Sequence, residues 1–187
     1  CLADCVESAQ GNTALPAEKA LAAGVFSYGN RLYCRWSEDN TRAHFSWGNT
    51  TSYSRYFQDY QQFIERPSVL ARKAEDENPE AAVFIVKLDL SAFYDNVDVK
   101  TLVRKLKTTY AAFRRQHRDA PGAEQSFWPL LMRIFANTWR EQDHELKKLF
   151  RGSVLPGGLP QGLLASGFLA NAYMLDFDNA LGAVAKT

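Results

Sequence analysis

The stretch that decides the fold reads Val83-Phe84-Ile85-Val86-Lys87-Leu88-Asp89-Leu90-Ser91-Ala92-Phe93-Tyr94-Asp95, a hydrophobic run that breaks on an acid and two aromatic residues. Apolar side chains alternate along its first half, which predicts a buried β-strand over residues 83–90. Asp89 lies at the end of this strand, where a buried carboxylate without a partner would be costly. Asp89 therefore needs either a divalent cation or a nearby positive side chain such as Lys87, which shares its face of the strand.

A second stretch places glycines and prolines before a helical pattern: Gly158-Leu159-Pro160-Gln161-Gly162-Leu163-Leu164-Ala165-Ser166. Glycine allows backbone to pass close to another group. The pattern predicts a non-helical link over residues 152–162 and a helix of small residues from Leu163 to about Leu181. Taken alone, it is also compatible with an ordinary helix start packed by small side chains.

Two helices are predicted between these stretches. Asp98 is a good N-cap for the first, whose apolar stripe leaves its basic residues facing outward. Pro121-Gly122 ends that unit, and the second helix begins near Glu124 and runs toward Trp139. The stripe of the first helix consists of Val99, Leu102, Val103, Leu106, Tyr110 and Phe113.

The first 82 residues give weaker patterns. We expect a helix over residues 17–23 and a strand or hairpin over residues 24–36. An aromatic stripe then recurs at helical spacing, and its helix is expected to end before Pro67. Such stripes are far more often core than a platform for stacked bases; this one consists of Tyr53, Tyr56, Phe57, Tyr60, Phe63 and Ile64.

Composition sets broad limits. The chain has 187 residues, 46% of them hydrophobic, which is enough for a folded core in one domain or one and a part. Its formal charge of +1 is too small to indicate a nucleic-acid partner. Lys and Arg nevertheless gather between Lys100 and Arg118 without an acid, while residues 75–80 are acidic. Solvated surface is the ordinary interpretation of both runs.

Cysteine usage and hydropathy favour a reduced, cytoplasmic protein. Cys1, Cys5 and Cys34 are odd in number and lack zinc-site spacing, so reduced thiols are expected. No apolar run reaches the length of a membrane span. The chain opens on Cys1 rather than Met and stops at Thr187 directly after a helical pattern, so we expect a fragment of a longer protein.

The two stretches together carry a resemblance. Residues Val86–Val97 resemble motif A of reverse transcriptases, and residues Leu159–Ser166, continuing through Leu169-Ala170-Asn171, resemble their motif B. Their order and the two predicted helices between them strengthen the resemblance. The Gln161 version of motif B and the continuation through Asn171 look more like bacterial antiphage or abortive-infection reverse transcriptases than retroviral ones; group II intron and retron enzymes remain open.

The resemblance implies specific roles. Asp89 would be the catalytic acid that ligates two Mg²⁺ ions, and the Leu90 carbonyl would help to hold one of them. The amides of Ala92 and Phe93 would face the incoming triphosphate, whereas the Phe93 side chain is expected in the core. Tyr94 would be the steric gate that excludes a 2′-hydroxyl, and Gln161 and Gly162 would lie against the incoming nucleotide.

The implied fold is α+β, a partial polymerase right hand. Residues 1–82 would be fingers-like and residues 83–187 the first half of a ferredoxin-like palm, with motif A at 83–98 and motif B at 158–171. Arg31 or Arg35 could grip the triphosphate, although surface arginines on a hairpin are equally compatible. The family's aromatic-x-Asp-Asp motif should follow this sequence, so the polypeptide by itself is expected to be inactive.

The function implied is that of an RNA-directed DNA polymerase, a cytoplasmic antiviral enzyme that adds deoxynucleotides to a hydroxyl group. Its partners would be an RNA template or associated RNA, a DNA primer or product, and dNTPs, without a membrane; the oligomeric state stays open. The alternatives are a catalytically dead polymerase-like module that binds RNA or scaffolds an oligomer, and an unrelated α+β binding domain.

Overall fold

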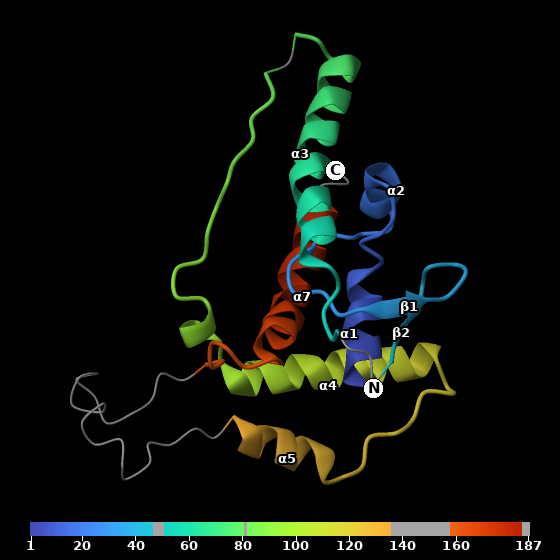
Figure 1. Ribbon diagram of the computed structural model, residues 1–187, viewed down its shortest axis with the longest axis vertical. Helices are drawn as coiled ribbons and strands as arrows, with labels where there is room; N and C mark the ends of the chain where they lie inside the picture. The colour runs from blue at the N-terminus through green and yellow to red at the C-terminus, as the bar shows by residue number, and fades with distance from the viewer. Residues whose placement is uncertain (47–50, 81, 136–157, 185–187) are drawn as a thin grey trace, which may run out of the picture. The chain divides into compact units, whose positions relative to one another are not determined.

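Helices and a single two-stranded sheet make up the described part of the chain, which is broadly α+β (Figure 1). The computed structural model describes residues 1–46, 51–80, 82–135 and 158–184. Two units are distinguished by their internal contacts, and each is described by itself. Unit 1 comprises Cys1–Leu90 with Met174–Thr187, and unit 2 comprises Ser91–Tyr173.

A helix lies against one strand of the small sheet in unit 1. Strands β1 (Cys34–Trp36) and β2 (Ala43–Phe45) pair antiparallel, with Cys34 opposite Phe45. Helix α1 (Leu2–Gln10) offers two side-chain acceptors to the amides of β2: Ser8 Oγ accepts from Ala43 at 2.8 Å, and Asp4 Oδ1 accepts from Phe45 at 2.8 Å. The sheet that the sequence predicts over residues 24–36 thus forms in part, at the end of that range.

Helix α2 (Ala17–Ala22) confirms the prediction for residues 17–23. A small cluster beside it contains Ala20, Val25 and Tyr28. Helix α3 (Tyr56–Glu77) contributes Arg66, whose guanidinium donates to the Val25 carbonyl and to the Tyr28 hydroxyl. Polar contacts of one buried arginine therefore connect α3 to this cluster.

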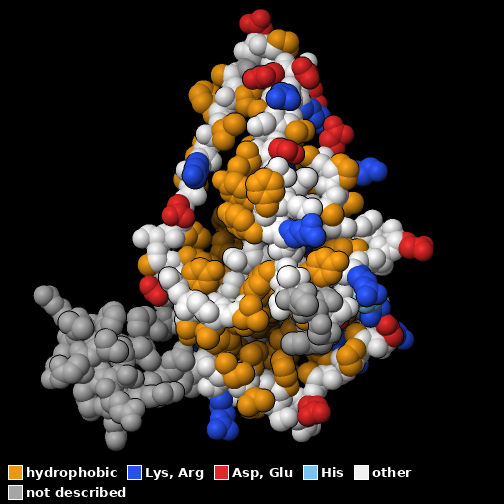
Figure 2. Space-filling view, in the orientation of Figure 1, with side chains coloured by type: hydrophobic (Ala, Val, Ile, Leu, Met, Phe, Trp, Pro, Cys, Tyr) orange, Lys and Arg blue, Asp and Glu red, His pale blue; other side chains and the backbone are white. Residues whose placement is uncertain are grey.

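Two predictions for α3 are wrong. The helix continues through Pro67, although proline removes a backbone N–H donor and disfavours a helix interior. Its aromatic stripe is exposed rather than core, since the buried positions of α3 are the polar Asp59 and Arg66. Hydrophobic side chains are accordingly visible on the surface over this helix (Figure 2). The exposed members include Tyr56, Phe57, Tyr60, Phe63 and Ile64.

The buried strand predicted over residues 83–90 is also not formed. This segment lies beyond the end of α3 at Glu77 and is an extended trace without a neighbouring strand (Figure 1). Its side chains are largely solvent-exposed, with Phe84 at 83% and Leu88 at 88%. A strand needs a hydrogen-bonded neighbour, and among the described residues this segment has none.

Unit 2 is built on helix α4 (Val99–Gln116), which confirms the predicted helix and its cap. The Asp98 carboxylate accepts from the Thr101 amide at 2.7 Å, and hydrogen bonds from Thr101 lower the pKa of Asp98. The helix buries Leu102, Leu106 and Phe113, as its stripe predicts. It ends at Gln116, before the Pro121-Gly122 pair.

Two more helices complete the described chain. Helix α5 (Phe127–Ile134) packs on α4, and the Tyr110 and Trp128 rings pack edge-on with their centroids 5.9 Å apart. Its predicted continuation toward Trp139 lies outside the described residues. Helix α7 (Ser166–Val184) confirms the small-residue helix, although it begins three residues later than predicted.

All three cysteines are free thiols, as expected. Burial raises the pKa of Cys5 to about 11 and that of Cys34 to about 12, so both are protonated at neutral pH. None of the helices in the described ranges is both long enough and apolar enough to cross a bilayer.

Candidate functional site

The two stretches singled out in the sequence meet inside unit 2. The Leu159 amide donates to the Tyr94 carbonyl at 2.9 Å. Gly158, with φ of +128°, is buried against the same turn, where an added Cβ would overlap the Tyr94 carbonyl oxygen. Segments far apart in the sequence are therefore joined by backbone, in a way that depends on a glycine.

A tight turn presents Tyr94 to this contact. Ala92 adopts a positive φ of 48°, which is unfavourable for a residue with a Cβ. A short 3₁₀ helix, η1 (Tyr94–Asn96), follows, and the Asn96 amide donates to the Ala92 and Phe93 carbonyls. The Asn96 side chain also donates to the Ala92 carbonyl, at 2.9 Å. These bonds hold the turn in its strained conformation.

An aromatic and cationic cluster supports the turn. The half-buried Phe93 ring contacts two other rings edge-on. Its centroid lies 5.8 Å from that of Tyr94 and 6.2 Å from that of Tyr173 in helix α7. Lys105 of α4 lies over the Tyr173 ring at 4.8 Å and donates to the Tyr173 carbonyl at 2.6 Å. Phe93 packs against neighbouring rings but is half-buried, not in the core as predicted, and Tyr94 is half-buried beside it.

The link after Gly158 is fixed at both ends. Leu159 is buried, and the buried Ser166 hydroxyl donates to the Pro160 carbonyl at 2.6 Å. Between them Gln161 and Gly162 are exposed. Gly162 has φ of +87° with nothing within 4 Å of an added Cβ, so open space surrounds it. The two residues predicted to contact a nucleotide therefore lie accessible on an anchored loop.

The contact between the stretches does not include Asp89 or Leu90. Both belong to the exposed extended segment at the end of unit 1, whereas Ala92, Phe93, Tyr94, Gln161 and Gly162 belong to unit 2. Across the described ranges, no group of three or more His, Cys, Asp or Glu side chains is placed to hold a metal ion. Asp89 and the Leu90 carbonyl are oxygen donors suited to Mg²⁺, but one carboxylate does not complete a two-metal site.

Arg31 is a structural residue and not a triphosphate ligand. Its side chain is buried in unit 1, where Nε donates to Glu7 Oε2 at 2.8 Å. Its other nitrogens donate to the carbonyls of Ser27, at 2.7 Å, and Gly11, at 2.5 Å. Sequence could not distinguish these roles because Glu7 lies on a separate helix. Arg35, the other candidate, is exposed on β1.

Lys105, Tyr173 and Gly158 were missed as site residues by sequence reasoning. One signal was available for Lys105. Successive helix residues are about 100° apart around the axis, so Lys105 lies on a different side of α4 from its outward-facing basic residues. Gly158 could have been suspected because it opens a Gly-Leu-Pro link. Nothing in the sequence marked Tyr173, which takes part through its ring and its carbonyl.

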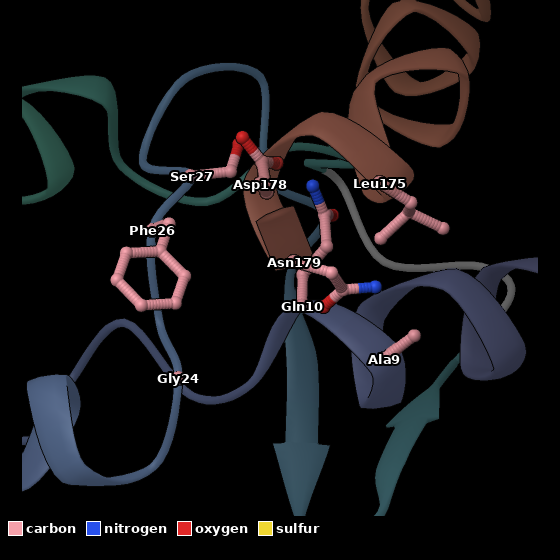
Figure 3. Close-up of a pocket in the computed structure, with 8 residues that line it drawn as sticks. All are labelled: Ala9, Gln10, Gly24, Phe26, Ser27, Leu175, Asp178 and Asn179. Atoms are coloured by element: carbon pink, nitrogen blue, oxygen red, sulfur yellow. The ribbon is translucent and has the colours of Figure 1, made fainter. Parts of the chain in front are cut away.

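A small polar pocket lies in unit 1, between α1, the 24–27 loop and α7 (Figure 3). Its volume of about 10 Å³ has room for one water-sized molecule. The Gln10 side chain lines it with both amide atoms buried and without a hydrogen-bond partner. Burial raises the pKa of Asp178 in its wall to about 6, and the positive charge of Arg31 opposes that rise. The pocket is far too small for a nucleotide.

Replacing Gly158 with Ala is expected to destabilise unit 2 strongly. The new Cβ would overlap the Tyr94 carbonyl and lie 2.8 Å from the Asp95 carbonyl oxygen, at a φ that disfavours side chains. Gly162→Ala is the matched control, because its φ is also positive but its surroundings are open. In chemical denaturation, Gly158→Ala should cost about 1–3 kcal/mol more than the control. Equal costs would mean that the two backbones do not approach closely.

Comparison with protein-family models, with curated proteins and with solved structures finds no match for this chain.

Proposed function

We propose that this sequence belongs to an RNA-directed DNA polymerase that adds deoxynucleotides to a hydroxyl group. The observation that carries the proposal is the backbone contact between the Tyr94 turn and the Gly158–Leu159 link. Two segments that resemble polymerase motifs A and B would both have to border one nucleotide. Their meeting inside one unit is what such a site requires, and chance resemblance in two segments gives no reason for it.

Each residue would have a defined task in this proposal. Tyr94, half-buried against Phe93, would lie under the sugar and exclude a 2′-hydroxyl. Gln161 and Gly162, exposed on the anchored loop, would contact the nucleotide, as would the amides of Ala92 and Phe93. Asp89 would be one carboxylate ligand of Mg²⁺, with the Leu90 carbonyl beside it, and the metal would stabilise charge on the transferring phosphoryl group.

A second candidate is a polymerase-like module that binds RNA or scaffolds an oligomer without catalysis. Asp89 is exposed and belongs to no described cluster of acids, and this position favours the second candidate.

Primer extension discriminates the two candidates, using protein from the complete reading frame that contains this sequence. DNA synthesis that depends on an RNA template supports the polymerase. Synthesis without a template supports nucleotidyl transfer but contradicts the proposed use of an RNA template. RNA binding without synthesis supports the module.

Replacing Tyr94 with Val should weaken discrimination against ribonucleotides. Removing the ring opens space for a 2′-hydroxyl, so the ratio of ribonucleotide to deoxynucleotide incorporation should rise about 10–200-fold. Tyr94→Phe is the matched control, because it keeps the ring and should keep the discrimination. The measurement is competitive single-nucleotide incorporation in a primer-extension assay. An unchanged ratio for Tyr94→Val would place the gate at another residue.

A further inference from the structure

The outward face of α4 carries a stripe of positive charge. Five of its basic side chains are exposed and fall within an arc of about 100° around the helix. They span about 22 Å along the helix axis, at the helical rise per residue. We call this set the basic stripe; it consists of Lys100, Arg104, Lys107, Arg114 and Arg115.

No acidic side chain of α4 balances this charge. From Lys100 to Arg118 the sequence contains no Asp or Glu, and α5, which packs on α4, adds Arg133 and again no acid. The described residues of unit 2 contain eight Lys and Arg against four Asp and Glu, a net charge of +4. The whole chain has a formal charge of only +1, so positive charge is concentrated in this unit.

The stripe is unfavourable for the helix that carries it. Lys100 and Arg104 are like charges four residues apart, and Arg104 and Lys107 are three apart; each such pair repels by a few tenths of a kcal/mol. Lys100 also lies in the first turn of α4, where a cation opposes the helix dipole. Of the stripe, Lys100 and Arg104 have an acid near them, the N-cap Asp98, whose pKa they help to lower. Helix stability therefore does not account for the arrangement.

The hydrophobic contacts of α4 do not account for it either. The helix buries Leu102, Leu106 and Phe113 on another face, while Lys105, outside the stripe, is the cation engaged by Tyr173. Lys107 lies near the Trp128 ring, at 5.6 Å, and remains exposed. The helix thus presents a row of exposed cations on one face while its opposite face is packed, and such a row suits a regular polyanion.

We propose that the basic stripe of α4 binds the phosphate backbone of a nucleic acid, outside the nucleotide site. The proposal does not rest on polymerase activity, because it requires binding alone. Recognition is through phosphates, which position a strand without reading its sequence. RNA and DNA share this chemistry, so both are compared in the test.

The test measures the salt dependence of binding to fluorescein-labelled 20-nucleotide single strands, one RNA and one DNA, using the full chain. If all five cations contact phosphates, log K should fall with log salt at a slope of about −3.5, so that raising salt from 50 to 200 mM weakens binding about a hundredfold. Arg104→Gln with Arg115→Gln should reduce the slope to about −2.1, which is about a twentyfold loss over that range. Glutamine retains good helix propensity, and circular dichroism confirms that α4 is intact.

The matched control is Arg72→Gln with Lys73→Gln on α3, which removes two exposed cations next to the acidic residues Glu75, Asp76 and Glu77. Its slope should equal that of the unmodified chain. An unchanged slope in the α4 variant, or an equal change in the control, would overturn the proposal. So would binding of anionic phospholipid vesicles that depends on the stripe while nucleic-acid binding does not. Tighter binding of RNA than of DNA at equal slopes would identify RNA as the preferred strand.

Discussion

Replacing Asp89 with Asn should reduce nucleotide addition about a thousandfold or more, if the proposed function is correct. Asparagine keeps the size of the side chain but removes the negative charge, and metal-assisted charge stabilisation contributes several kcal/mol to a phosphoryl-transfer barrier. The fold should be unaffected, because the Asp89 side chain is exposed and takes no part in core packing. The measurement is the rate of primer extension by protein from the complete reading frame, at saturating Mg²⁺ and dNTP.

Asp95→Asn provides the control for this experiment. Asp95 is an exposed acid in the same stretch, six residues after Asp89, and the resemblance gives its side chain no metal role. Its replacement should change the rate little. A rate that survives Asp89→Asn would contradict the assignment of motif A, and comparable losses in both variants would indicate a general effect of negative charge in this stretch.

Local signals predicted helices α2, α4 and α7, whereas helix α1 was not predicted and α3 continues past its predicted end. Asp98 was identified as a cap from its residue type and the apolar stripe that follows it, and both are decided within a few residues of the helix start. The small-residue helix was likewise found, with its start misplaced by three residues. These features depend on residues that are close together in the sequence, so the local pattern of residue types is enough to predict them.

Non-local interactions were not predictable in this way. The alternation over residues 83–90 identifies an extended segment, but a strand also needs a partner, and alternation does not supply one. The stripe on α3 shows the same limit: helical spacing gave the helix, whereas the polar contacts of Asp59 and Arg66 decide which face is buried. The contact between Tyr94 and Leu159 was suggested only by the family resemblance, since no local pattern links these segments.

The ion pair between Glu7 and Arg31 is a buried contact between residues that are far apart in the sequence. Both side chains are buried, with Glu7 1% and Arg31 3% exposed, and Glu7 Oε1 also accepts from the Leu32 amide at 2.9 Å. Burial raises the pKa of Glu7, while the Arg31 charge and these hydrogen bonds oppose the rise. The pair joins α1 to the segment that leads into β1, so it connects two elements that are not adjacent in the sequence.

Replacing Glu7 with Ala should lower the free energy of unfolding by about 3–5 kcal/mol, because it leaves the guanidinium of Arg31 buried without a counter-charge. The measurement is denaturant unfolding of the chain at neutral pH. Glu77→Ala is the matched control: it breaks the exposed pair between Lys73 and Glu77, whose atoms are 3.8 Å apart, and should cost less than about 0.5 kcal/mol. The double variant Glu7→Met with Arg31→Met should recover much of the loss, since no buried charge remains unpaired. If the double variant were as unstable as Glu7→Ala, the cost would come from lost hydrogen bonds and packing, and not from the isolated charge.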